Sequence, residues 1–226
     1  MGGFLNNSLN TTFQYGVFSI IIDRLLFCSK TMKKTCLEKV YKIPNDEETI
    51  RTHLLEKYLN NDILLRNTGL TYINLRFIPE AQENYSSIDD SYAGRTDIKV
   101  VTESWFKNIN DYYTIECKRI DGNLDLNKKY VTKGISRFII EPVQYNSNHN
   151  CNIMFGFVVR NIKIDLNTDK IANIQLEQDI INSMIVKNFS LVKNDADYYL
   201  YFSLYNLKNK QIELHHIFYD FSQIIK

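Results

Sequence analysis

The chain has 226 residues and a net charge of +1, from 27 basic and 26 acidic side chains. This length is enough for one domain that buries a full hydrophobic core. The balanced charge excludes a protein that is basic over its whole surface, so any contact with nucleic acid has to come from a local patch. We therefore predict a single domain over residues 1–226, in which residues 1–12, rich in Gly, Asn and Thr, are loosely ordered.

The cysteines and the first apolar stretch indicate where the protein works. No Cys-X-X-Cys pair and no clustered histidines are present to complete a zinc site, so we expect reduced thiols in a cytoplasmic protein. The apolar stretch 13–28 is interrupted by Asp23 and Arg24, which favours a buried element over a signal peptide or a membrane anchor. We expect no contact with a membrane. The cysteines are Cys28, Cys36, Cys117 and Cys151.

The first half of the chain predicts one amphipathic helix and one strand. Residues 13–42 indicate one or two elements that pack on the core. A helix is expected to start with Asn45 as N-cap and Glu48 as capping-box partner, and to end at residues 60–61. A β-like run over 70–78 is ended by Pro79, and the polar residues 80–92 predict an exposed loop. The apolar positions of the helix are Ile50, Leu54, Leu55, Tyr58 and Leu59.

The middle of the chain predicts a hairpin of strands at 97–102 and 112–120, with Trp105 and Phe106 in its connection. A turn at 121–123 precedes a helix over 126–139. On this helix Lys129, Lys133 and Arg137 share one face, and Val131, Ile135 and Phe138 lie on another.

The last third predicts a strand at 152–160, a helix at 173–187 and a closing hairpin of strands at 198–205 and 211–221. His215 and His216 are adjacent in the last strand and therefore point to opposite faces, which favours ordinary strand residues over metal ligands. The alternation of helices and strands indicates a mixed α/β fold.

Two carboxylates and a lysine are expected to meet on the central hairpin. Asp97 opens the first strand, and Glu116 and Lys118 share one face of the second because they are two residues apart. Such a group could hold a divalent cation against a phosphate. Two ligands of one Mg²⁺ with bonds near 2.1 Å cannot lie more than about 8 Å apart, so the Asp97 and Glu116 carboxylates have to be closer than that.

At these residues the sequence resembles the PD-(D/E)XK, or restriction-endonuclease-like, phosphodiesterases. The resemblance rests on Asp97, on Glu116-Cys117-Lys118 and on the helix at 126–139; Thr96 stands where the family pattern has Pro. It covers residues 46–160 and implies a restriction-endonuclease-like mixed β-sheet core, over about residues 44–165, flanked by helices. Acid-X-Lys triplets also occur by chance, and Asp97-Ile98-Lys99 is one, so a solvated strand face is the competing interpretation.

The resemblance also implies the roles of the site residues. Asp97, Glu116 and the main-chain carbonyl of Cys117 would bind Mg²⁺, with Mn²⁺ able to substitute, and Lys118 would orient or deprotonate the attacking water. Glu47 is preferred over Glu48 as a further acid, because it shares a helix face with the apolar residues. The expected nucleic-acid contacts are Lys129, Lys133, Arg137 and Arg95, with Lys133 at the family's helix position. A solvated helix face for the first three, and an exposed turn residue for Arg95, is the competing interpretation.

The predicted function is that of a Mg²⁺-dependent nuclease that hydrolyses phosphodiester bonds, with DNA favoured over RNA. We expect a microbial effector of antiviral, anti-phage defence or restriction, acting as a homodimer or with a partner protein that supplies recognition or activation. Two alternatives remain open. One is a catalytically inactive subunit of the same fold that binds nucleic acid or a partner protein, and the other is a purely structural subunit of a larger complex.

Overall fold

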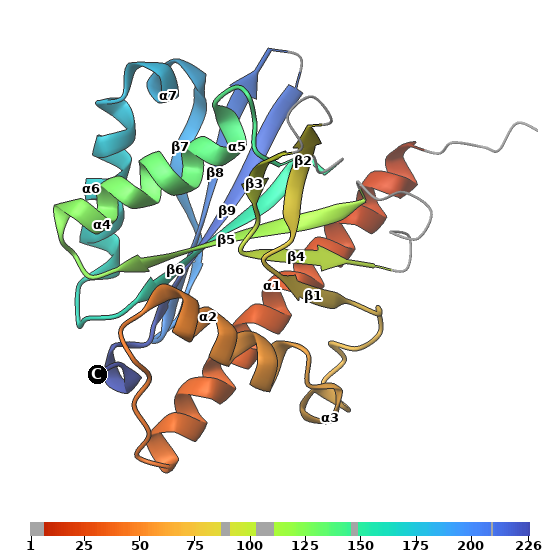
Figure 1. Ribbon diagram of the computed structural model, residues 1–226, viewed down its shortest axis with the longest axis vertical. Helices are drawn as coiled ribbons and strands as arrows, with labels where there is room; N and C mark the ends of the chain where they lie inside the picture. Colours follow the sequence, from red (N-terminus) through yellow and green to blue (C-terminus); the bar gives the residue numbers. More distant parts are fainter. Residues whose placement is uncertain (1–6, 87–90, 103–110, 146–148, 209) are drawn as a thin grey trace, which may run out of the picture.

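The computed structural model describes residues 7–86, 91–102, 111–145, 149–208 and 210–226. Trp105 and Phe106 lie outside these ranges. In the described part, a seven-stranded mixed sheet is flanked by helices, and two further strands form a separate hairpin (Figure 1). The predicted mixed α/β class is therefore confirmed.

The large sheet has the strand order β1-β4-β5-β6-β9-β8-β7. β6 runs parallel to both β5 and β9, and the other neighbours are antiparallel. The strands are β1 (Arg76–Pro79), β4 (Ile98–Val101), β5 (Tyr112–Ile120), β6 (Cys151–Val158), β7 (Ile185–Asn194), β8 (Tyr198–Leu207) and β9 (Lys210–Asp220). This confirms the central hairpin, the strand that follows it and the closing hairpin.

Helices cover both faces of the sheet (Figure 1). One hydrophobic core lies between the sheet and the first two helices and includes Ile115 and Phe155. A second core lies on the opposite face and includes Met154, Leu214 and Phe218. Alternate residues of a strand thus enter different cores. The helices are α1 (Asn7–Glu38), α2 (Glu47–Leu54), α3 (Asp62–Leu65), α4 (Leu124–Tyr130), α5 (Ser136–Ile139), α6 (Ile164–Leu176) and α7 (Asp179–Met184).

α1 corrects the prediction for the beginning of the chain. Residues 7–12, expected to be loosely ordered, belong to this helix, and residues 13–38 continue it as one element. Its buried side chains recur every three or four residues and face the sheet. Arg24 is buried among them, and its Nε donates to the Leu59 carbonyl at 3.0 Å. In the part of the chain that is described, no helix combines the length and apolar character needed to cross a bilayer.

The helix after Pro44 starts one residue later than predicted. Asp46, rather than Asn45, is the N-cap: its carboxylate accepts from the Thr49 backbone N–H at 2.8 Å. The N3 position is therefore Thr49, and Glu48 is an exposed first-turn acid rather than a capping-box partner. The helix continues through a π-helical turn (η1, Leu55–Leu59) and ends at Asn60, as predicted.

Three other boundaries differ from the predictions. Of the β-like run 70–78, only residues 76–78 belong to a strand, β1, which also includes Pro79. The predicted loop 80–92 holds β2 (Gln82–Ser86) and the first two residues of β3 (Ser91–Arg95), a hairpin whose polar residues carry no period-2 apolar signal. The predicted helix 173–187 covers the end of α6, all of α7 and the first residues of β7.

The helix after β5 is close to its prediction. It is helical from residue 124 to residue 139, with a π-helical turn (η3, Val131–Ile135) between α4 and α5, and it begins two residues earlier than expected. Val131, Ile135 and Phe138 are buried, and Lys129 and Lys133 are exposed, as the pattern indicates. It connects two parallel neighbours, β5 and β6.

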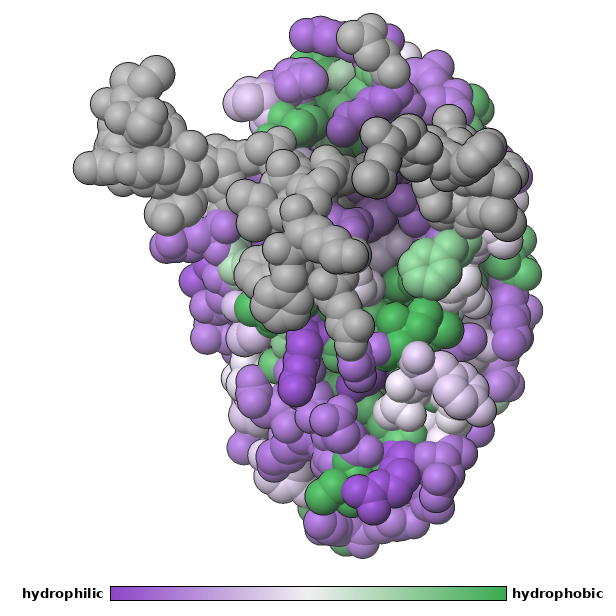
Figure 2. Space-filling view, turned by 90° about the vertical axis from the view of Figure 1, so that its right-hand side faces the viewer, coloured by the Kyte–Doolittle hydropathy of each residue, from purple (hydrophilic) through white to green (hydrophobic). Residues whose placement is uncertain are grey.

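The β1 edge of the sheet is separate from the predicted site. A pocket of about 610 Å³ lies there, lined by β1 and by Arg24, and none of the predicted site residues lines it. Figure 2 shows this side of the molecule, where hydrophilic surface surrounds smaller hydrophobic areas. The candidate site is found elsewhere, where α2 and α4–α5 approach β5.

Candidate catalytic site

The ammonium group of Lys118 lies at the centre of the predicted site. Its Nζ is 2.7 Å from Glu116 Oε1, 3.1 Å from Glu47 Oε1 and 3.7 Å from Asp97 Oδ2. It also donates to the Cys117 main-chain carbonyl at 2.6 Å. The structure therefore brings together Asp97, Glu116, Lys118 and Glu47, the four residues predicted to be catalytic.

Three elements position these side chains. Asp97 directly precedes β4, and its Oδ2 accepts from the Cys117 backbone N–H of β5 at 2.7 Å. Glu116 and Lys118 project from one face of β5, as their spacing predicts. Glu47 is the first residue of α2, and its Oε2 accepts from the Arg119 backbone N–H at 3.0 Å. Each acid is therefore fixed to the central strand by a backbone or side-chain hydrogen bond.

The carboxylates satisfy the distance limit for a shared cation. The Asp97 and Glu116 oxygens both lie within 4 Å of the same Lys118 nitrogen, so they are closer to each other than about 8 Å. Within the described residues, however, the oxygens of Glu47, Asp97 and Glu116 do not form a group in which all lie within 4.8 Å of one another. The ammonium separates them.

The atoms around Lys118 Nζ fit the chemistry of Mg²⁺. The four contacts described above are three carboxylate oxygens and one carbonyl oxygen, which are the hard donors that Mg²⁺ prefers. They include both carboxylates and the carbonyl that the sequence predicts as ligands. An ammonium and a divalent cation would compete for these oxygens, so Lys118 has to give up some of its contacts when a cation binds.

Besides Lys118, two arginine side chains contact Asp97 and Glu116. Arg51 is buried, and its two terminal nitrogens contact Asp97 Oδ1 and Glu80 Oε1, each at 2.5 Å. Arg137 Nη1 donates to Glu116 Oε1 at 2.7 Å. The resemblance assigned the family's helix position to Lys133, but it is Arg137 that contacts the acidic group.

Sequence reasoning missed Arg51 and Tyr145. The Tyr145 hydroxyl donates to Glu116 Oε2 at 2.5 Å, so both oxygens of this buried carboxylate have partners. Arg51 falls four residues after Glu47 on the same helix face, and this spacing could have indicated it. Tyr145 follows helix α5 in an irregular segment, and no sequence pattern points to it.

The electrostatics of Glu116 follow from its burial. Burial raises the pKa of Glu116 to about 7, and the nearby Asp97 adds to the increase, while Lys118 and Arg137 oppose it. Burial alone would lower the pKa of Lys118, but the three carboxylates outweigh it and raise that pKa. Lys118 is therefore a firmly protonated ammonium in this arrangement.

A basic pocket of about 320 Å³ opens beside the acids. It is lined by Glu47, Lys118, Arg119, Leu126, Lys129, Lys133 and Arg137, so the three basic residues predicted on the helix face the same space as the site. Arg95, the fourth predicted contact, does not line it; its guanidinium pairs with Glu80 Oε2 at 3.0 Å and is largely exposed.

No model of a known protein family matches the chain, and neither a curated protein nor a solved structure matches it significantly. A function for this chain has to be argued from its own fold and from the chemistry of its site.

Proposed function

We propose that this protein is a Mg²⁺-dependent nuclease of the restriction-endonuclease-like type. The observation that carries the proposal is the position of Lys118: its ammonium contacts Glu47, Asp97, Glu116 and the Cys117 carbonyl, beside a pocket lined with basic side chains. A fortuitous acid-X-Lys triplet on a solvated strand face would not be surrounded by two further carboxylates from separate elements.

The topology supports the same proposal. A helix, α2, precedes the antiparallel strands β1, β4 and β5, and the helical segment 124–139 then leads to β6, parallel to β5. This order resembles the core that the sequence pattern implies. The sheet extends beyond it, because β9, β8 and β7 continue from β6 and α1 covers one face.

The side chains have distinct roles in the proposed reaction. Asp97, Glu116, Glu47 and the Cys117 carbonyl would hold Mg²⁺ or Mn²⁺. The bound cation would neutralise charge that develops on the phosphate and acidify the attacking water. Lys118 donates to a non-bridging phosphate oxygen or orients the water. The attacking water gives a proton to solvent as its oxygen forms the new bond to phosphorus; the bond to the leaving oxygen breaks, and that oxygen takes a proton from solvent.

The surrounding residues position these groups. Arg51 fixes Asp97, and Tyr145 and Arg137 fix Glu116, so the acids keep their orientation when a substrate enters. Lys129 and Lys133 are exposed at the pocket and contact phosphates on either side of the scissile bond.

DNA is the proposed substrate, in an effector of antiviral defence or restriction that works as a homodimer or with a partner protein. The net charge of +1 supports the need for a partner or a second copy, because a single chain offers only a local basic surface. The four cysteines are free thiols, which supports a place in the reducing cytoplasm.

The proposal is tested by incubating the purified chain with supercoiled plasmid in Mg²⁺, in Mn²⁺ and in EDTA. We expect nicking that requires the metal and that falls at least about 100-fold in Asp97→Ala, Lys118→Ala and Glu47→Ala. Glu48→Ala is the matched control, since its side chain is exposed next to Glu47 in the same helical turn; it should cleave within about two-fold of the wild type.

An inactive wild type whose variants all remain folded would refute a nuclease that acts without a partner protein. One observation favours the alternative of a non-catalytic subunit: Lys118 already neutralises the oxygens that a cation would need. That alternative predicts duplex DNA binding or partner binding without cleavage, unchanged by EDTA.

A further inference from the structure

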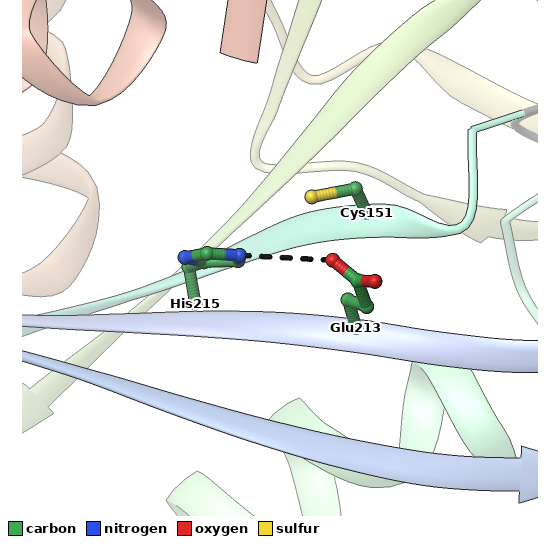
Figure 3. Close-up of side chains that lie close together, drawn as sticks. All are labelled: Cys151, Glu213 and His215. Atoms are coloured by element: carbon green, nitrogen blue, oxygen red, sulfur yellow. Dashed lines mark ion pairs between the residues drawn. The ribbon is translucent and has the colours of Figure 1, made fainter. Parts of the chain in front are cut away.

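A second group of potential metal ligands lies on the opposite face of the sheet. Glu116 and Lys118 project toward the core that contains Met154, whereas Cys151, Glu213 and His215 have the strand parity of Ile153 and Ile217 and point toward α1. Figure 3 shows the three side chains converging from β6 and β9. The two groups of residues are therefore distinct sites.

The pairing of two parallel strands builds this group. β6 and β9 are neighbours, with Cys151 opposite Glu213 and with His215 two residues further along β9. One ligand atom from each side chain, a thiol sulfur, a carboxylate oxygen and an imidazole nitrogen, lies within 4.8 Å of the other two. No Cys-X-X-Cys pair or clustered histidines indicated a zinc site in the sequence, and only the strand pairing brings these three residues together.

Within the described part of the chain, the two ring nitrogens of His215 lack hydrogen bonds. Neither Nδ1 nor Nε2 has a hydrogen-bond partner among the described residues, although both atoms are buried. Its ring lies edge-on to Phe18 and Phe202, with centroid distances of 4.8 and 5.4 Å. These contacts fix the position of the ring but give its nitrogens no hydrogen bond. Burying polar atoms without hydrogen bonds is unfavourable, so the imidazole lacks a partner in this arrangement.

The remaining contacts leave room for that partner. The Tyr15 hydroxyl of α1 donates to Glu213 Oε1 at 2.9 Å, and Glu213 Oε2 lies 4.0 Å from His215 Nε2, an ion-pair distance that is too long for a hydrogen bond (Figure 3). Cys151 and Glu213 also line a pocket of about 480 Å³. A cation between the three side chains would have protein ligands on one side and this pocket on the other.

We propose that Cys151, Glu213 and His215 bind a Zn²⁺ ion, with a fourth position open to the pocket. Sulfur, imidazole nitrogen and carboxylate oxygen are all ligands of Zn²⁺, and three protein ligands with one open position differ from a closed structural site. The Cys151 thiol gives its proton to solvent as the sulfur–zinc bond forms. Mg²⁺ does not compete, because it prefers all-oxygen sites such as the one around Lys118.

Cobalt is the sharpest probe, since a thiolate ligand gives Co²⁺ a near-ultraviolet charge-transfer band that an all-oxygen site cannot give. The full-length chain, freed of metal with a chelator, is titrated with Co²⁺ and then with Zn²⁺. We expect the band to saturate at one Co²⁺ per chain and to disappear when Zn²⁺ replaces it. Cys151→Ser should lose the band, and Cys36→Ser, a buried cysteine of α1 outside the group, should keep it.

Two further variants separate this site from the proposed nuclease site. Asp97→Ala should keep the cobalt band, because the zinc site does not depend on the nuclease proposal. Tyr15→Phe keeps all three ligands but removes the hydrogen bond to Glu213, and should weaken Zn²⁺ binding by about 10- to 100-fold.

The proposal is overturned if the wild type gives no cobalt band, or if the band survives in Cys151→Ser. If Cys151→Ser does not fold, the site is tested on the wild type alone. Zn²⁺ then has to raise the melting temperature of the wild type and to slow the alkylation of Cys151, which mass spectrometry locates. The absence of either effect refutes the site.

Discussion

At the scale of single residues, the site depends on how the buried Glu116 carboxylate is satisfied. It is completely buried, and Tyr145 is the partner of its Oε2 at 2.5 Å. Tyr145→Phe removes that donor, together with the longer hydrogen bond that the hydroxyl accepts from Arg137 Nη1 at 3.3 Å, so we expect the free energy of unfolding to fall by about 1–3 kcal/mol. Urea denaturation measures this change. Tyr72→Phe, at a side chain that is 88% exposed, is the control and should change it by less than about 0.5 kcal/mol. Equal effects of the two substitutions would show that the Tyr145 hydroxyl does not support Glu116.

His216 gives the protein a pH-dependent stability that is independent of the acids around Lys118. It is fully buried between the Tyr130 and Ser203 hydroxyls, and burial, together with the adjacent His215, holds its pKa well below the usual value. The unfolded chain protonates this histidine near pH 6.5 but the folded chain does not. The contribution of His216 is therefore complete above about pH 6.5 and is lost as the pH falls below it, by up to about 1.4 kcal/mol per pH unit.

Urea denaturation of the wild type and of His216→Gln, in EDTA between pH 5 and pH 7.5, checks this dependence. Below about pH 6.5, the unfolding free energy of the wild type should fall more steeply with decreasing pH than that of His216→Gln. The slopes should differ by up to about 1.4 kcal/mol per pH unit, the contribution of one bound proton. The substitution also costs stability at every pH, so the slope and not the absolute value is the readout. Parallel curves for the two proteins would refute the assignment.

Residue chemistry explains which parts of the site were predictable. Asp97, Glu116 and Lys118 were found because strand periodicity places side chains on a face without any knowledge of long-range contacts. Glu47 was chosen over Glu48 by helical periodicity, and the structure places only Glu47 against Lys118. Tyr145 was missed because its contact with Glu116 depends on the path of an irregular segment, which no local pattern encodes.

At the scale of elements, the helix over residues 124–139 depends on a close approach to the sheet. A Cβ on Gly134 would lie 2.5 Å from Met154 Cε and 3.6 Å from Lys118 Cγ. Met154 Cε is the end of a flexible side chain, but Met154 is fully buried, so Gly134→Ala should force it to repack and destabilise the protein by up to about 1 kcal/mol, although alanine is the better helix former.

Gly16→Ala is the matched control for this prediction. Gly16 lies in α1, and a Cβ there would meet no atom within 4 Å. The substitution should stabilise the protein by about 0.5–1 kcal/mol through helix propensity alone. Thermal unfolding of the two variants gives the comparison, and shifts of the same sign would contradict the close approach at Gly134.

The elements that sequence patterns predicted are those whose local signal agrees with their environment. β5 was predicted with its bounds because a β-like apolar run is bordered by a turn with Gly122 in the left-handed region, at a φ of +85°. α1 escaped assignment because its buried stripe includes Arg24 and other polar residues, which blur the helical period. The β2–β3 hairpin was missed for the opposite reason: its strands are polar, and only their mutual pairing defines them.

At the scale of the whole molecule, the net charge limits how strongly the proposed nuclease can attract a nucleic acid. With a net charge of +1, long-range attraction is weak, and the basic pocket has to supply the contacts. Two of its lysines, Lys129 and Lys133, are exposed, and among the described residues neither forms an ion pair with Glu47, Asp97 or Glu116, so their removal should weaken binding without altering the chemistry. The third basic residue of the row, Arg137, is engaged with Glu116 and is unsuitable for this test.

The salt dependence of binding makes this argument quantitative. In an uncleaving Asp97→Ala background, Lys129→Ala/Lys133→Ala should lower the slope of log affinity for duplex DNA against log salt by about 1.8, since each phosphate contact contributes about 0.9. Lys30→Ala/Lys34→Ala removes the same charge from exposed positions on α1, on the other face of the sheet, and should leave the slope unchanged. If both pairs lower it equally, binding follows total charge, and the pocket beside Lys118 is not where the phosphates lie.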